Sequence, residues 1–160
     1  MKKIDLLLNS LLIVFVITLS ALVLNLVNPS IDMPFGNADE VDSPSDWIDE
    51  SQINVYDSQV VLNIENPRFV GFSDTNSMDP IFDVEANVIE ILPENINDIN
   101  LGDIISFETE NNEVYIHRVV AKDYDDEGLY FITKGDNNKN TDPIFVRWSQ
   151  IIGVVVAIIY

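Results

Sequence analysis

Three separated segments of the chain hold the side chain types that a serine hydrolase needs. Ser77 lies in the turn-forming run of residues 74–80, beside apolar Met78 and shortly before a proline that restricts the backbone. His117 is the only histidine of the chain, and Asp136 lies in a turn rich in glycine and asparagine. Serine, histidine and aspartate can act as nucleophile, general base and orienting acid. The sequence therefore predicts acyl-transfer chemistry at Ser77.

His117 is the residue expected to accept the Ser77 proton, because imidazoles exchange protons near neutral pH. If residues 114–120 form a strand, alternation places Tyr115, His117 and Val119 on one face. The structural alternative is a lone histidine packed at a sheet edge.

Two lysines are alternative bases for a Ser–Lys dyad. These are Lys122 and Lys134, and either amine would have to be desolvated before it could take a proton from Ser77. The oxyanion formed on attack needs aimed donors, and the backbone N–H of Ser77 is the natural first one.

In combination, these segments resemble type I signal peptidases, specifically the archaeal and endoplasmic-reticulum branch. The resemblance covers Gly71 to about Tyr160. The matching boxes, in chain order, are Ser77-Met78-Asp79-Pro80, Gly102-Asp103-Ile104-Ile105 with His117-Arg118-Val119, and Lys134-Gly135-Asp136-Asn137-Asn138 with Asp142. Bacterial members carry a lysine base directly before the Arg-Val pair, so a histidine at that position indicates the histidine-type branch.

The resemblance implies two candidates for the acid that orients His117. One is Asp136 in the Gly-Asp-Asn-Asn turn, and the other is Asp142 a few residues later. Each has a structural alternative, since Asp136 is also a good turn residue and Asp142 precedes Pro143 as an Asp-Pro turn start does. The choice between the two carboxylates stays open at this point.

The resemblance also implies residues for the oxyanion and the substrate. Thr75, two positions before the nucleophile, is a candidate second donor, while Asn76 is less well placed to reach. Met78 and Pro80 are candidate substrate-binding residues. The chain departs from the family just beyond, where residues 81–87 replace the usual Gly-Asp turn, so the shape of the groove beside Ser77 is not implied.

Composition excludes several other classes of protein. The net charge is −19, and residues 28–160 carry 6 basic against 26 acidic side chains. Such a surface repels nucleic acid, and we interpret it as a solvated acidic surface, with attraction of basic peptide segments as the alternative. There is no cysteine and one histidine, so we predict no metal and no cofactor.

The N-terminal part predicts a membrane anchor. Residues 6–27 contain no charged side chain and are long enough, as a helix, to cross a hydrocarbon core of roughly 30 Å. Lys2 and Lys3 precede this run, which favours a cytoplasmic N-terminus and an extracytoplasmic domain. The alternative is a cleaved signal peptide, but the run is longer than a typical h-region. We expect an anchor over residues 1–27 and an acidic juxtamembrane linker over residues 28–52.

Residues 53–160 show the pattern of short strands separated by turns. Candidate strands rich in Ile and Val are residues 53–64, 69–72, 87–92, 104–107, 114–120, 129–133 and 151–160. We therefore predict a mainly β fold, an antiparallel domain of sandwich or partly open barrel type.

These expectations together describe a single-pass membrane serine endopeptidase that removes signal peptides from exported proteins. Its partners would be signal peptides and the bilayer, with partner subunits left unassigned. One rival is a non-catalytic, membrane-anchored module that binds peptides or partner subunits. Another is a self-cleaving peptidase of the repressor kind, which the predicted anchor and the lack of a DNA-binding half disfavour.

Overall fold

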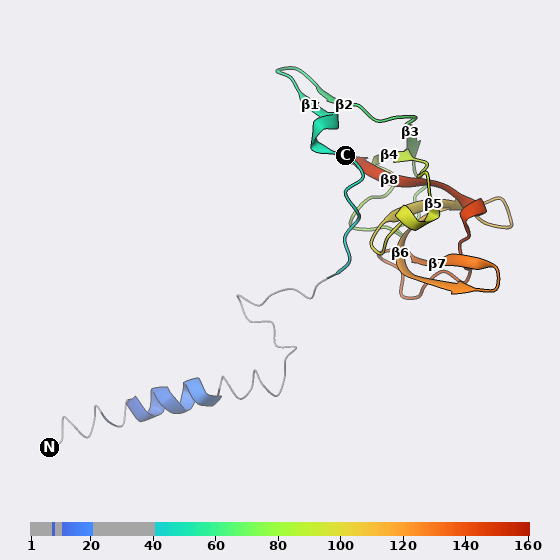
Figure 1. The fold of residues 1–160 in the computed structure, drawn as a ribbon. Helices are drawn as coiled ribbons and strands as arrows, with labels where there is room; N and C mark the ends of the chain where they lie inside the picture. The colour runs from blue at the N-terminus through green and yellow to red at the C-terminus, as the bar shows by residue number, and fades with distance from the viewer. Residues whose placement is uncertain (1–7, 9–10, 21–40) are drawn as a thin grey trace. The chain divides into compact units, whose positions relative to one another are not determined.

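The computed structural model describes residue 8, residues 11–20 and residues 41–160 (Figure 1). Leu8 and residues 11–20 are helical, and residues 41–160 form a separate compact unit. None of the helices in the described part of the chain is long and apolar enough to cross a membrane. The rest of the predicted anchor, and the predicted linker up to residue 40, lie outside the described residues.

The prediction of a mainly β, antiparallel domain is confirmed. The strands are β1 (Ile53–Val55), β2 (Val60–Leu62), β3 (Arg68–Gly71), β4 (Asn87–Ile91), β5 (Ile104–Glu108), β6 (Val114–Asp125), β7 (Gly128–Lys134) and β8 (Ile151–Ile159). Three short 3-10 helices lie between them, η1 (Glu50–Gln52), η2 (Ile96–Asp98) and η3 (Trp148–Gln150). The predicted strand over residues 53–64 is instead a hairpin of two short strands, and β6 continues past residue 120 to Asp125.

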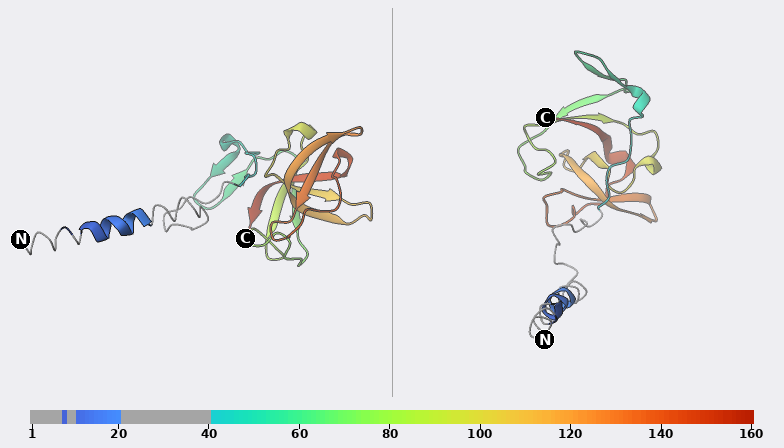
Figure 2. Two further views of the ribbon diagram at one scale, coloured as in Figure 1. Left: turned by 90° about the horizontal axis from the view of Figure 1, so that it is seen from below. Right: turned by 90° about the vertical axis from the view of Figure 1, so that its left-hand side faces the viewer.

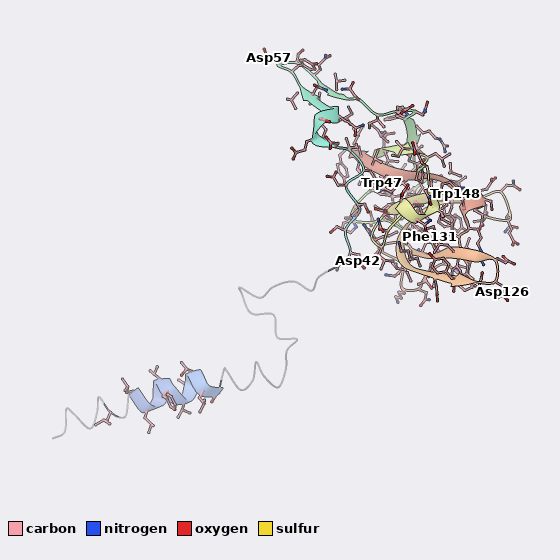
Figure 3. All side chains as sticks on the ribbon, viewed as in Figure 1. Asp42, Trp47, Asp57, Asp126, Phe131 and Trp148 are labelled. Atoms are coloured by element: carbon pink, nitrogen blue, oxygen red, sulfur yellow. The ribbon has the colours of Figure 1, made fainter. Side chains whose placement is uncertain are left out.

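Six of the strands form one sheet in the order β3-β4-β8-β5-β6-β7, and every pair in it is antiparallel. Figure 2 shows these strands curling around the interior rather than lying in a flat layer. Strands β1 and β2 form a separate two-stranded hairpin. Acidic residues occupy the hairpin turns, as Asp57 and Asp126 show in Figure 3. Charges at these tips keep the hairpin ends solvated.

Both faces of the sheet carry a hydrophobic cluster. One cluster consists of Ile99, Ile105, Phe107, Val119, Phe131, Val146, Ile151 and Val154. The other consists of Met78, Phe82, Ala86, Val88, Ile104 and Val155. Adjacent residues of β5 and β8 belong to opposite clusters, because side chains alternate along a strand. This explains why the sequence of these central strands is almost continuously apolar.

The segment before η1 is packed on the β domain through one buried carboxylate. Asp103, with no exposed surface, accepts hydrogen bonds from the Ser45 backbone N–H at 2.6 Å and from Trp47 Nε1 at 3.1 Å. It also accepts one from the Asn100 backbone N–H at 2.8 Å. A side chain at Gly102 would meet the backbone of Ser43. Residues 43–47, within the predicted linker, therefore belong to the compact unit.

A second buried carboxylate, Glu90 on β4, has no such partners. Its side chain has no exposed surface, and neither of its oxygens nor Ser106 Oγ has a hydrogen-bond partner within the described residues. Gly153, which pairs with Ser106 across β5 and β8, lies against this side chain, and a Cβ atom there would stand 3.1 Å from Glu90 Oε2. Burial raises the pKa of Glu90 above its usual range, because the charged form would lose its hydration.

Candidate active site

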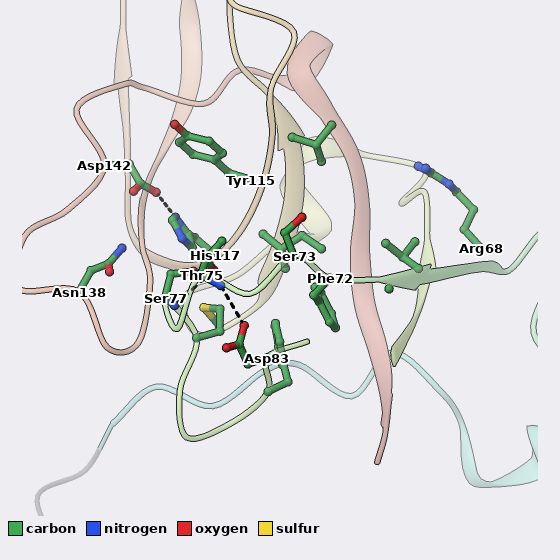
Figure 4. A pocket seen from close by; sticks show the side chains of 16 residues that line it. Arg68, Phe72, Ser73, Thr75, Ser77, Asp83, Tyr115, His117, Asn138 and Asp142 are labelled. Carbon is green, nitrogen blue, oxygen red and sulfur yellow. Dashed lines mark hydrogen bonds and ion pairs between the residues drawn. The ribbon is translucent and has the colours of Figure 1, made fainter. Parts of the chain in front are cut away.

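One pocket of the β domain brings the predicted nucleophile and base together. It has a volume of about 690 Å³, and both Ser77 and His117 line it, with Thr75 and Asp142 beside them (Figure 4). The walls come from the end of β3, the loop of residues 73–83 and the start of β6. Residues far apart in the sequence thus converge on one cavity.

His117 is held by Asp142. The imidazole Nδ1 lies 2.7 Å from Asp142 Oδ2, and the two side chains are 9% and 7% exposed. An ionised carboxylate only accepts hydrogen bonds, so Nδ1 carries the proton and Nε2 is left as the free nitrogen. His117 lies on the same face of β6 as Val119, as the alternation predicted, and Val119 belongs to the buried core.

Thr133 also contacts this carboxylate and is not among the site residues predicted from the sequence. Its hydroxyl donates to Asp142 Oδ2 at 2.6 Å, and its carbonyl accepts from the Asp142 backbone N–H at 2.8 Å. The side chain is fully buried on β7. The sequence did offer one signal for Thr133. Buried strand residues are usually apolar, and here a threonine stands two residues before the Gly-Asp turn.

The loop that carries Ser77 is ordered by its own polar groups. Thr75 Oγ1 lies 3.1 Å from Ser77 Oγ and 3.4 Å from the Ser77 backbone nitrogen. The Asp83 carboxylate accepts from the backbone N–H groups of Thr75 and Asn76, each at 3.3 Å. Asn76 has a positive φ of 57°, a conformation that asparagine tolerates better than most residues. Thr75 is thus adjacent to the nucleophile, as the resemblance implied.

The Gly-Asp-Asn-Asn turn fixes the same loop from the opposite side. The Asn137 backbone N–H donates to the Ser77 carbonyl at 3.0 Å, and its side chain donates to the Asn76 carbonyl at 2.9 Å. A Cβ atom at Gly135 would lie 2.6 Å from the Ser77 carbonyl oxygen. Only glycine lets this turn come so close to the serine loop.

Asp136 lies in this turn, but its carboxylate is directed at Arg118 rather than at His117. Arg118 Nε and Nη2 donate to Asp136 Oδ1 and Oδ2 at 2.8 and 2.6 Å, and Arg118 Nη1 donates to the Gly102 carbonyl at 2.7 Å. Adjacent residues of β6 point to opposite faces, so Arg118 and His117 hold different aspartates. Of the two candidate acids, Asp142 is the one in contact with the imidazole.

The remaining predicted residues lie in varied surroundings. Met78 is 3% exposed, lines the pocket and packs in the second core cluster. Pro80 is exposed and lies outside the set of pocket-lining residues. Lys122 Nζ donates to the Ile99 carbonyl at 3.2 Å, and neither Lys122 nor Lys134 lines the pocket. Within the described ranges, His, Asp and Glu side chains form no group of three that could hold a metal ion.

Comparison of the chain with protein-family models, with curated proteins and with solved structures gave no match. A serine whose loop is ordered, an imidazole held by a carboxylate and a shared cavity are the elements of nucleophilic acyl transfer. Apolar side chains of Val70, Phe72 and Ile116 also line the pocket, together with polar Ser73 and Asn138.

Proposed function

We propose that the protein is a membrane-bound serine endopeptidase that cleaves N-terminal signal peptides from exported proteins. The observation that carries the proposal is the 2.7 Å contact between His117 Nδ1 and Asp142 Oδ2 in the pocket that Ser77 lines. The resemblance of the three sequence boxes to signal peptidases supplies the substrate class. It also supports a signal-peptidase-like, partly open barrel as the finer description of the fold.

The proposed reaction uses these residues. In the free protein Ser77 Oγ lies 3.1 Å from Thr75 Oγ1, so the hydroxyl has to turn toward His117 before it reacts. Ser77 Oγ attacks the carbonyl carbon of the scissile peptide bond while its proton passes to His117 Nε2. Asp142 holds the Nδ1–H and stabilises the imidazolium that forms. The proton then passes to the leaving amine as the C–N bond breaks, which leaves an acyl ester on Ser77. Water, deprotonated by His117, hydrolyses the ester and restores the free serine.

The oxyanion of the tetrahedral intermediate requires donors that are ordered before the reaction. The backbone N–H of Ser77 and the hydroxyl of Thr75 lie next to each other at the nucleophile. We assign both to this role. In the free protein the Ser77 N–H donates to Thr75 Oγ1 at 3.4 Å, so this long hydrogen bond has to give way to one with the oxyanion. Asp83 and Asn137 hold the surrounding backbone in place while it does so.

The proposed location is the cell membrane, with the N-terminus in the cytoplasm and the β domain on the side where exported chains emerge. It is supported by the uncharged run of residues 6–27 and by Lys2 and Lys3 before it.

The decisive experiment is cleavage of a reporter preprotein by the full-length protein in detergent, with products identified by mass. We expect one defined cut by the wild type, and its loss in Ser77→Ala and His117→Ala. Ser58→Ala, at the exposed β1–β2 turn, is the matched control and should cleave normally. Circular dichroism checks that each variant is folded.

Two other outcomes would contradict parts of the proposal. If His117→Ala cleaved normally while Ser77→Ala did not, the base would be a lysine or another group. If the wild type bound the preprotein without cutting it, and Ser77→Ala bound it equally well, the non-catalytic binding module would be the better description.

A further inference from the structure

Asp142 uses one oxygen for two hydrogen bonds. Oδ2 accepts from His117 Nδ1 at 2.7 Å and from Thr133 Oγ1 at 2.6 Å. Both distances fall within the ranges for charge-assisted hydrogen bonds, about 2.7–2.9 Å for N–H···O and about 2.5–2.7 Å for O–H···O. The threonine hydroxyl has one proton, and this geometry directs it at the oxygen that also accepts the imidazole N–H.

The position of Thr133 is determined by the sheet. It pairs with Val119 across β6 and β7, and Val119 lies two residues after His117 on the same face. The Thr133 carbonyl also accepts the Asp142 backbone N–H at 2.8 Å. Asp142 is therefore held by Thr133 at both its backbone and its side chain.

Packing alone does not require a hydroxyl at this position. Thr133 has no exposed surface, and valine has nearly the same shape without the cost of burying a polar group. A threonine has restricted χ1 rotation because it is β-branched, so its hydroxyl keeps one direction. Such a group can stop a carboxylate from rotating away from an imidazole.

We propose that Thr133 is a positioning residue, whose hydroxyl orients the Asp142 carboxylate so that His117 keeps its proton on Nδ1 and leaves Nε2 free. The importance of this role for turnover rests on the proposed peptidase function. The effect on the imidazole does not, because it follows from the contacts of the free protein.

The test compares Thr133→Val, which removes the hydroxyl, with Thr133→Ser, which keeps it. The full chain is labelled with ¹⁵N-histidine in detergent, and the spectrum reports the tautomer of its single histidine. Cleavage of the reporter preprotein gives kcat and KM for the same samples. Thr109→Val, at the turn before β6, is the matched control, and Thr133→Ala replaces Thr133→Val if the latter does not fold.

We expect wild type, Thr133→Ser and Thr109→Val to show the Nδ1–H tautomer, and Thr133→Val to show a mixture with Nε2–H. In Thr133→Val, kcat should fall about tenfold with KM unchanged. The role is overturned if Thr133→Val keeps only the Nδ1–H tautomer, whatever its stability. If the tautomer changes but even the wild type does not cleave, Thr133 positions the pair and the proposed function is wrong.

Discussion

Arg118 and Asp136 form a bidentate ion pair, with the Nε–Oδ1 and Nη2–Oδ2 distances at 2.8 and 2.6 Å. The pair is mostly shielded from water, with side chains 14% and 19% exposed. It joins β6 to the turn that contacts the Ser77 carbonyl. The two aspartates near the site therefore have separate tasks: Asp142 holds the imidazole, and Asp136 ties the turn to β6 through Arg118.

This separation predicts that the same substitution, Asp to Asn, impairs catalysis at one position and stability at the other. Asp142→Asn should lower kcat by roughly 10³- to 10⁴-fold, since an amide does not favour the Nδ1–H tautomer. Asp136→Asn should instead lower the free energy of unfolding by about 3 kcal/mol, because it leaves Arg118 without its charge partner. Reporter cleavage and urea unfolding of both variants check this. Equal losses of kcat with unchanged stability would contradict the assignment.

The Thr75 hydroxyl is expected to contribute to the rate without contributing to binding. Thr75→Val should lower kcat by about 10²-fold and leave KM unchanged, as loss of one oxyanion donor does. Thr75→Ser keeps the hydroxyl and serves as the control. If Thr75→Val kept the wild-type kcat, Thr75 would not be an oxyanion donor. The Ser77 N–H would then be the one donor that remains assigned.

Glu90 should make stability depend on pH. Its folded-state pKa is raised by burial, in spite of the neighbouring Ser106 hydroxyl and the charge on Arg68, so the folded state retains a proton that the unfolded state has lost. Stability is then complete below the unfolded pKa of about 4.3 and falls as pH rises from that value to the folded pKa. Glu90→Gln removes the titrating group.

Urea unfolding at several pH values tests this prediction. The free energy of unfolding of Glu90→Gln minus that of wild type should be more positive at pH 7 than at pH 4. Glu94→Gln, at an exposed position three residues beyond the Ile91 end of β4, is the control and should show no such change. If the free energy of unfolding changed with pH in the same way in wild type and Glu90→Gln, the buried carboxylate would have no net effect on the pH dependence of stability.

Asp103 should determine whether residues 43–47 stay packed on the β domain. Asp103→Asn places an amide N–H₂ opposite donors such as Ser45 N–H and Trp47 Nε1, so we expect a loss of about 2–4 kcal/mol. Limited proteolysis with mass detection should then find new cuts in residues 41–52. Asp126→Asn, at an exposed turn, is the control. Unchanged protection in Asp103→Asn would show that Trp47 packing alone is sufficient.

The sequence pattern predicted the strands well where both faces are apolar. Residues 104–107 and 151–160 nearly coincide with β5 and β8, because no other element fits such runs of Ile and Val. It did not resolve the break between β1 and β2, because no glycine or proline marks the turn there, although Tyr56 and Asp57 interrupt the alternation. Periodicity reports which residues face a core but not where a strand reverses.

The site was predictable only as a set of residue types. Ser77, His117, Thr75 and the two candidate aspartates were identified by motif, but spacing along the chain could not say which carboxylate meets the imidazole. That depends on the pairing of β6 with β7, which sets Thr133 beside Val119. Thr133 and Glu90 were missed as polar core residues, because a lone polar residue in a strand looks like a surface position. Asp103 was missed because it directly precedes β5, next to a glycine, where an aspartate looks like an exposed turn residue.

The contacts around Ser77 also bear on the temperature dependence of the proposed reaction. Asp83 and Asn137 immobilise the serine loop before any substrate arrives, so the loss of backbone freedom occurs during folding rather than at the transition state. Wild-type turnover should therefore have a small unfavourable activation entropy. Substitutions that release the loop should slow the reaction mainly through that entropy, with the activation enthalpy nearly unchanged.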